Sequence, residues 1–257
     1  MNLAEVALGI AASSDEASVT DVAKVAQASG FATLWVNDTP MGDGIANASW
    51  ILDATDLSAG IGVLSVDRRP IESFGDRVGS MASDRLVIGI GAGFSNDPIA
   101  DTRRAVERAR QNLECKIAVG AMGPKMCTLA GEIADVVLLN WMVPERIEWA
   151  KELIMRGAAK TGNAPTIAAY VRVAIDEGAE DRLEEEANRY ANLPHYARHF
   201  DAMGIEPSRV GIACAASDVD DVLLPYREVL DQTIARALPA SPSFEDMTRI
   251  IEAARRR

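Results

Sequence analysis

Six short groups of residues follow apolar segments of this 257-residue chain, where side chains could bind a ligand or take part in chemistry. They are Asn37–Asp38, Leu64–Ser65, Gly93–Ser95, Met122–Gly123, Asn140–Trp141 and Arg172. Neither Ser65 nor Ser95 has a histidine near it in sequence, because the two histidines, His195 and His199, lie far along the chain. A hydrolytic triad is therefore not expected. Few reactive side chains at such positions are typical of an enzyme whose cofactor carries the chemistry.

The apolar segments that position these residues alternate with helical patterns. They lie near residues 5–11, 32–37, 60–65, 86–91, 116–121, 136–140, 166–174 and 232–238. Short apolar strands alternating with amphipathic helices indicate a parallel sheet. Eight such units in this length predict an α/β fold, a (β/α)8 TIM barrel formed by a single domain over residues 1–257. An open doubly wound sheet is the alternative.

Nine helices are expected around these strands. Their ranges are 19–29, 43–57, 71–82, 98–112, 124–134, 144–160, 180–203, 219–230 and 243–255.

The segment Lys116–Trp141 is the most specific part of the chain. It reads as a buried strand, a Met122-Gly123-Pro124 turn, a short helix and a second buried strand. Gly123 lets the backbone turn, and proline suits the first helical position. The unpaired N–H groups of such a helix start form a good seat for a phosphate, with Lys125 beside it. The alternative is a purely structural connection.

Composition excludes several functions. The 38 acidic residues outnumber the 26 basic ones and give a formal charge of −12, which argues against a nucleic-acid surface. We expect no membrane span and no signal peptide. The three cysteines have no paired spacing and fit a reducing cytoplasm. These features predict a cytoplasmic protein.

Segments spread over nearly the whole chain resemble one family. GPKMCTLAGEIADVVLLNW at 123–141, FATLWVND at 31–38, GIGVLSVDRRP at 60–70 and RLVIGIGAGF at 85–94 resemble the luciferase-like flavin and deazaflavin oxidoreductases. TIAAYVRVAID, HYARHFDAMGI and TIARALPA resemble later segments of that family. The branch that contains methylenetetrahydromethanopterin reductase is the most similar. The resemblance also places RVGIACAA at 209–216, which could pass for a ninth strand, in a loop.

This resemblance implies an oxidoreductase that uses deazaflavin (coenzyme F420) or FMN and works as a homodimer. Hydride would pass between the cofactor and a small organic substrate, or reduced flavin would activate oxygen. It also implies a bulge with a non-proline cis peptide at Gly62-Val63. The residues it assigns to the cofactor are Gly62, Val63, Gly93, Phe94, Met122, Gly123, Pro124, Lys125, Asn140 and Trp141.

Some candidate roles have two interpretations. Asp38 is either a loop or helix-cap hydrogen-bond acceptor or a polar contact or proton carrier at the cofactor. Trp141 is either a plug of the barrel or a wall on which a ring stacks. Lys125, Arg103 and Arg104 could meet an anionic cofactor tail or lie on solvated helix faces.

Two further patterns do not predict a binding site. The glycines of IGIGAGF lack the spacing of a dinucleotide fingerprint. His195 and His199 could face one metal ion, but no third ligand follows and no metal site is expected.

The chain departs from the family pattern at three points, of which Thr39 and the shortened connection after the fourth strand favour an alternative function. Thr39 stands where many relatives have a histidine, and Arg68-Arg69-Pro70 replaces the more usual Arg-His-Pro. Only about two dozen residues separate GIGAGF from KIAVGAM, enough for a loop and one helix. The family's long insertion is therefore missing, which predicts an open pocket or one closed by a partner subunit. The alternative function is a flavin-binding or degenerate barrel without turnover.

Overall fold

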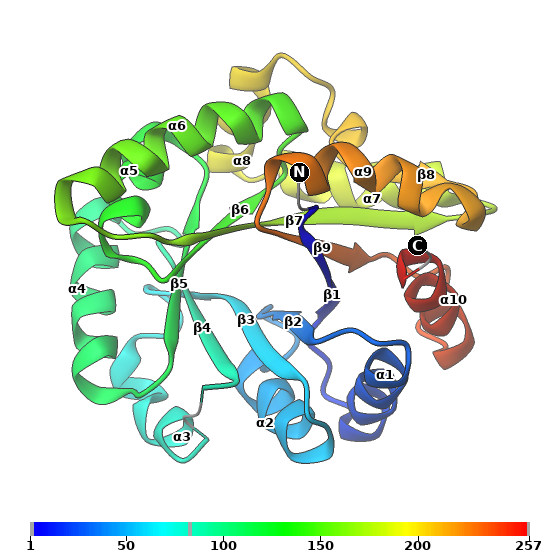
Figure 1. Cartoon of the computed structure of the whole chain (residues 1–257), viewed down its shortest axis with the longest axis horizontal. Helices are drawn as coiled ribbons and strands as arrows, with labels where there is room; N and C mark the ends of the chain where they lie inside the picture. The colour runs from blue at the N-terminus through cyan, green and yellow to red at the C-terminus, as the bar shows by residue number, and fades with distance from the viewer. Residues whose placement is uncertain (1–2, 82–83, 256–257) are drawn as a thin grey trace.

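The computed structural model describes residues 3–81 and 84–255. Eight parallel strands close into a barrel with helices outside it (Figure 1). In barrel order the strands are β1 (Glu5–Ala11), β2 (Thr33–Asn37), β3 (Ser58–Ser65), β4 (Leu86–Gly91), β5 (Lys116–Ala121), β6 (Val136–Asn140), β7 (Thr166–Ile175) and β9 (Gln232–Ala237). Pairing of β6 with β7 and of β9 with β1 completes the ring. The predicted (β/α)8 TIM barrel is confirmed, and the open sheet is excluded.

The helices begin where the sequence supplies caps. Asp15, Asp43 and Asp97 accept hydrogen bonds from the first-turn amides of α1 (Glu16–Ala28), α2 (Gly44–Ala54) and α4 (Pro98–Asn112). Proline opens α5 (Pro124–Ile133) and α6 (Pro144–Thr161), where its missing N–H costs nothing. Later in the chain come α9 (Val219–Val229) and, at the end of the described residues, α10 (Phe244–Arg255).

Two expected helices are interrupted. The range 180–203 divides into α7 (Ala179–Ala191) and α8 (Pro194–Met203), because Pro194 cannot donate an N–H and forces Leu193 into an extended conformation. The range 71–82 contains a 3-10 turn at Ile71–Ser73 and the short helix α3 (Gly75–Gly79). Glycines at both ends of α3 disfavour a longer helix. Ala82, the expected end, lies outside the described residues.

The segment that the resemblance assigned to a loop contains a short strand, β8 (Ile212–Cys214), so that expectation was wrong. β6 pairs with β7 only as far as Tyr170. The last part of β7, from Val173 to Ile175, therefore extends beyond the end of β6. β8 pairs with β7 along this stretch. An unpaired strand edge readily accepts a further strand.

The interior of the barrel is filled by side chains that point inward from the strands. A buried cluster contains Trp35, Leu138, Tyr170 and Ile234, with Trp35 and Tyr170 in edge-to-face contact at 6.3 Å between ring centroids. The larger apolar core lies between the strands and the surrounding helices. The lower barrel is therefore solid, and a site can form only at its C-terminal mouth.

Candidate active site

The bulge in β3 lies at the barrel mouth. The register between β3 and β4 shifts between Ile61 and Leu64, and the Gly62–Val63 peptide bond is cis, as expected. Asn37 donates a hydrogen bond from Nδ2 to the Gly62 carbonyl over 2.8 Å. A Cβ on Gly62 would lie 2.5 Å from the Tyr170 hydroxyl and 2.6 Å from Leu138. Only glycine therefore fits at this point of the strand.

The start of α5 is the second element of the mouth. Gly123 precedes Pro124 in an extended conformation, and no side chain caps the first turn. A Cβ on Gly123 would meet no atom within 4 Å, so the space in front of the helix is open. Lys125 is exposed, and the first turn carries no acidic residue. Free amides, the helix dipole and a nearby ammonium group form a seat for an anion.

The loop after β4 carries Gly93 and Phe94. Gly93 has a φ of +57°, and a Cβ there would run into the Asp67 carboxylate and Ser65. Asp67 accepts a hydrogen bond from the Phe94 amide at 3.2 Å. This contact fixes the loop and leaves the Phe94 side chain 66% exposed. Phe94 therefore presents an apolar face at the rim of the mouth.

Asp38 does not face the mouth as a free acid. Its side chain is fully buried, accepts a hydrogen bond from the Gly44 amide at 3.0 Å and is paired with Arg68 and Arg69. These contacts match the structural interpretation of Asp38, a loop hydrogen-bond acceptor. The carboxylate ties the loop after β2 to the loop after β3.

We expect Asp38→Asn to destabilise the fold by about 1–2 kcal/mol, because it removes the charge from contacts with two guanidinium groups and leaves them with a weaker acceptor. Both arginines are partly exposed, which limits the loss. Urea denaturation of the wild type and the variant measures the difference. An unchanged free energy of unfolding would show that the carboxylate is not an anchor.

Helix α8 covers the β6 side of the mouth. The Asn140 amide donates to the Tyr196 hydroxyl over 2.9 Å, and His199 Nε2 lies 2.7 Å from the Trp141 carbonyl oxygen. His195 contacts Phe94 edge-to-face, with 5.3 Å between ring centroids. α8 thus reaches from the end of β6 to the loop after β4. The expected open mouth is partly closed by the chain itself.

Trp141 lies beneath this cover and is fully buried. Its ring contacts Tyr190 and Phe200, and the Arg172 guanidinium stacks on it at 4.0 Å. This packing favours the interpretation of Trp141 as a side chain that fills the end of the barrel over the interpretation as a surface on which a cofactor ring stacks. Asn140, half-buried beside it, accepts a hydrogen bond from Arg172. These two residues lie together at the end of β6, whose Leu139 pairs with Ala121 at the end of β5.

The two histidines of α8 make the cover sensitive to pH. Burial lowers the pKa of His199, and the Arg146 charge lowers it further, although the hydrogen bond with the Trp141 carbonyl raises it. Burial and the Arg198 charge lower the pKa of His195. The unfolded chain therefore binds protons that the folded chain does not, and stability falls as the pH drops from about 6.5 through the folded pKa values.

We expect the wild type to lose thermal stability between pH 7.5 and 5.5, and His199→Gln to flatten this dependence. Thermal unfolding across that range measures it, with His195→Gln as the less buried comparison. Equal pH dependence in the wild type and both variants would contradict this account of α8.

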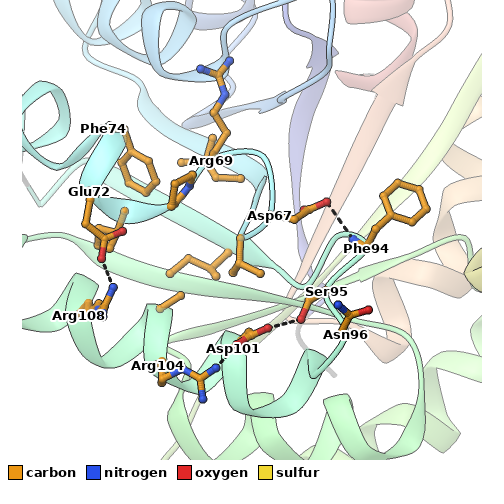
Figure 2. Close-up of a pocket in the computed structure, with 16 residues that line it drawn as sticks. Asp67, Arg69, Glu72, Phe74, Phe94, Ser95, Asn96, Asp101, Arg104 and Arg108 are labelled. Carbon is orange, nitrogen blue, oxygen red and sulfur yellow. Dashed lines mark hydrogen bonds and ion pairs between the residues drawn. The ribbon is translucent and has the colours of Figure 1, made fainter.

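A separate cavity of about 410 Å³ lies between the loop after β3 and α4 (Figure 2). Apolar side chains such as Leu64, Ile71 and Phe74 line its floor. At its rim Glu72 pairs with Arg108 and Asp101 pairs with Arg104, so the charges balance. Of the residues expected to bind the cofactor, only Phe94 lines it. The cavity therefore lies beside the barrel mouth and not within it.

The other expected charges are engaged elsewhere. Arg103 pairs with Glu132 at 2.8 Å, on the outer side of the barrel between α4 and α5. Among the described residues no three His, Cys, Asp or Glu side chains gather in a way that could hold a metal ion. No helix in the described part of the chain is long and apolar enough to cross a membrane.

Sequence reasoning missed Arg236. It lies opposite Arg172 in the pairing of β7 with β9, is 8% exposed and donates from Nε to Asn37 Oδ1 over 2.6 Å. The signal was present, since a charged residue within the apolar strand TIARA has no place in an ordinary barrel core. Tyr170, Tyr190 and Tyr196 were also missed, because their proximity depends on how α7 and α8 fold over the mouth.

Comparison with known proteins agrees with the barrel fold. A model of the luciferase-like monooxygenase family matches residues 99–212. The 5,10-methylenetetrahydromethanopterin reductase of Methanolobus tindarius is 26% identical over 203 residues, 63% of this chain and 62% of the relative. This chain therefore resembles the luciferase-like monooxygenase family. The same reductase of Archaeoglobus fulgidus is 29% identical over 196 residues, 60% of this chain and 59% of its own.

Solved structures show the same fold over the full length. The coenzyme F420 dependent tetrahydromethanopterin reductase of Methanopyrus kandleri has a TM-score of 0.74 and 17% identity, covering 99% of this chain and 98% of its own. An F420-dependent secondary alcohol dehydrogenase, solved with an F420-acetone adduct, has a TM-score of 0.79 and 13% identity, covering 99% of both chains. In sequence, this chain matches only about three fifths of the length of these curated relatives.

Proposed function

We propose that the protein is a flavin- or deazaflavin-dependent oxidoreductase that transfers hydride to or from a small organic substrate. The observation that carries this proposal is the combination of the glycine bulge at Gly62–Val63 with an open, uncapped helix start at Gly123. The first would set strand backbone against a planar ring, and the second would offer amides to a phosphate. The named relatives, reductases and monooxygenases, support this class.

The residues at the mouth fit such a cofactor. Gly62 and Val63 would back the ring, with Gly93 and Phe94 along its edge. Met122, Gly123, Pro124 and Lys125 would hold the phosphate, and Asn140 and Trp141 would close the far side. When bound, the cofactor supplies the hydride chemistry. The chain's own residues orient the ring, and α8 excludes water from it.

Deazaflavin is the cofactor we favour, since two similar solved structures are named as dependent on F420. FMN is the second candidate, because one similar monooxygenase is named with FMN. We further propose a single barrel domain, a cytoplasmic location and a homodimer. A partner subunit would then cover the part of the mouth that α8 leaves open.

A binding protein without turnover is the second candidate function. Two observations favour it: Thr39 stands where many relatives have a histidine, and Asp38, the one acid at the start of this loop, is bound to two arginines. Under this candidate the cofactor would bind but no hydride would move.

Titration of the purified protein with oxidised FMN and with the deazaflavin coenzyme, followed by fluorescence quenching, tests the proposal. We expect saturable binding of one of the two, with a lower dissociation constant for deazaflavin. A folded protein that binds neither would overturn the oxidoreductase. Binding without reduction or oxidation of the cofactor by any tested substrate would favour the binding protein.

A further inference from the structure

Two arginines enter the barrel mouth from neighbouring strands. Arg172 of β7 and Arg236 of β9 are register partners, one pleat above Tyr170 and Ile234, which point into the barrel interior. Side chains two residues apart on a strand share a face, so both guanidinium groups lie inside the barrel. Arg172 is 1% exposed and Arg236 is 8% exposed.

Neither guanidinium forms an ion pair among the described residues. Arg236 contacts the neutral Asn37 side chain and the Ala237 carbonyl, and Arg172 contacts Asn140 and the rings of Trp141 and Tyr190. Glu186 affects the pKa of Arg236 from a distance, but its ion pair is with Arg189 at 3.4 Å. Buried charges are ordinarily paired, because removing an ion from water is costly.

The free atoms of Arg172 have a particular geometry. Its Nη1 bonds to Asn140, whereas Nε and Nη2 are buried without a hydrogen-bond partner. Nε and Nη2 form one side of the planar guanidinium, whose parallel N–H groups match the two oxygens of a carboxylate. The buried Tyr170 hydroxyl also lacks a partner. Burial raises the pKa of Tyr170, and the charges of Arg236 and Arg172 oppose this shift. Tyr170 and Arg172 are two residues apart on β7, so their unpaired polar groups lie on the same face of that strand.

We propose that Arg172 and Arg236 bind a carboxylate of the substrate beside the cofactor ring. Arg172 would hold both oxygens through Nε and Nη2, Arg236 would supply the second positive charge, and the Tyr170 hydroxyl would donate a further hydrogen bond. The substrate class is thus a small organic acid. This assignment rests on the proposed function for its cofactor, but not for anion binding itself.

Access to this subsite runs past α7 and α8. Tyr190 and Trp141 lie against Arg172, and Tyr196 accepts a hydrogen bond from Asn140. An anion would therefore reach the two arginines only when α8 moves away from the end of β6. A bound carboxylate would then neutralise the two buried charges and favour the closed position of α8.

The test measures thermal unfolding of the protein without cofactor, at constant ionic strength, against increasing oxalate, acetate, inorganic phosphate and acetamide. The variants are Arg172→Gln, Arg236→Gln and the charge-retaining Arg172→Lys. Arg104→Gln, at the rim of the separate cavity, is the matched control. Circular dichroism establishes that each variant is folded.

We expect oxalate and acetate to raise the unfolding midpoint of the wild type and of Arg104→Gln, and uncharged acetamide to have no effect. Affinity for oxalate should fall at least tenfold in both glutamine variants and less in Arg172→Lys. Equal midpoint shifts in all variants, or no shift in the wild type, would overturn the proposal. Tighter binding of phosphate than of oxalate, lost in both glutamine variants, would overturn the carboxylate assignment.

A parallel cofactor titration separates this proposal from the proposed function. We expect the glutamine variants to keep the wild-type affinity for the cofactor within about threefold, because the guanidinium pair serves the substrate. An equal loss of cofactor and oxalate affinity would assign the pair to the cofactor and overturn the substrate role. Oxalate binding without any cofactor binding would instead contradict the oxidoreductase and leave the anion site standing.

Discussion

Replacing Gly123 with leucine is expected to weaken cofactor binding about 100-fold, equivalent to about 2.7 kcal/mol, while the barrel remains folded. The added side chain would meet no protein atom near its Cβ, so it would project into the open space in front of α5. This is the space in which the phosphate would lie against the first-turn amides. Leucine is also a poorer N-cap than glycine, which would cost at most about 1 kcal/mol of stability.

Gly79→Leu is the matched control for this substitution. Gly79 ends α3, and a Cβ there also meets no atom within 4 Å. Fluorescence titration of both variants with FMN and deazaflavin gives the affinities, and thermal unfolding gives the stabilities. Unchanged affinity in a folded Gly123→Leu protein would remove the phosphate from the start of α5.

Gly62→Ala is expected to destabilise the protein by about 3 kcal/mol, because overpacking a filled barrel forces side chains from their preferred positions. The new Cβ would lie 2.5 Å from the Tyr170 hydroxyl and 2.6 Å from Leu138 Cδ2. Both neighbours are buried inside the barrel and have little room to move.

A compensating variant makes this prediction specific. Leu138→Ala combined with Tyr170→Phe removes the two closest contacts and leaves only Tyr170 Cε2, at 2.9 Å. Gly62→Ala should therefore cost less stability in this double variant than in the wild type. Gly75→Ala, where the Cβ meets nothing, is the control. Denaturant unfolding measures all of them. Full wild-type stability in Gly62→Ala would contradict the close packing at the mouth.

Much of the fold was predictable because local signals agree with the barrel. Apolar runs marked the strands to within a few residues, and proline and aspartate marked most helix starts. The interruption of the helix expected at 180–203 could also have been predicted, because Pro194 indicates a helix boundary. β8 was harder, because its pairing depends on how far β7 extends past β6.

The candidate site was only partly predictable. The glycines of the mouth could be located, since their chemistry is that of the backbone. The environment of Asp38 could not, because it depends on two arginines about 30 residues away in the chain. The position of α8 over the mouth, and the pairing of Arg172 with Arg236, likewise depend on long-range packing.

The measurement that tests the central claim most directly is a crystal structure of the protein with the bound cofactor. The account predicts the ring against Gly62–Val63 at the barrel mouth and the phosphate at the start of α5. A cofactor bound instead in the cavity between the loop after β3 and α4, with the start of α5 free, would contradict it.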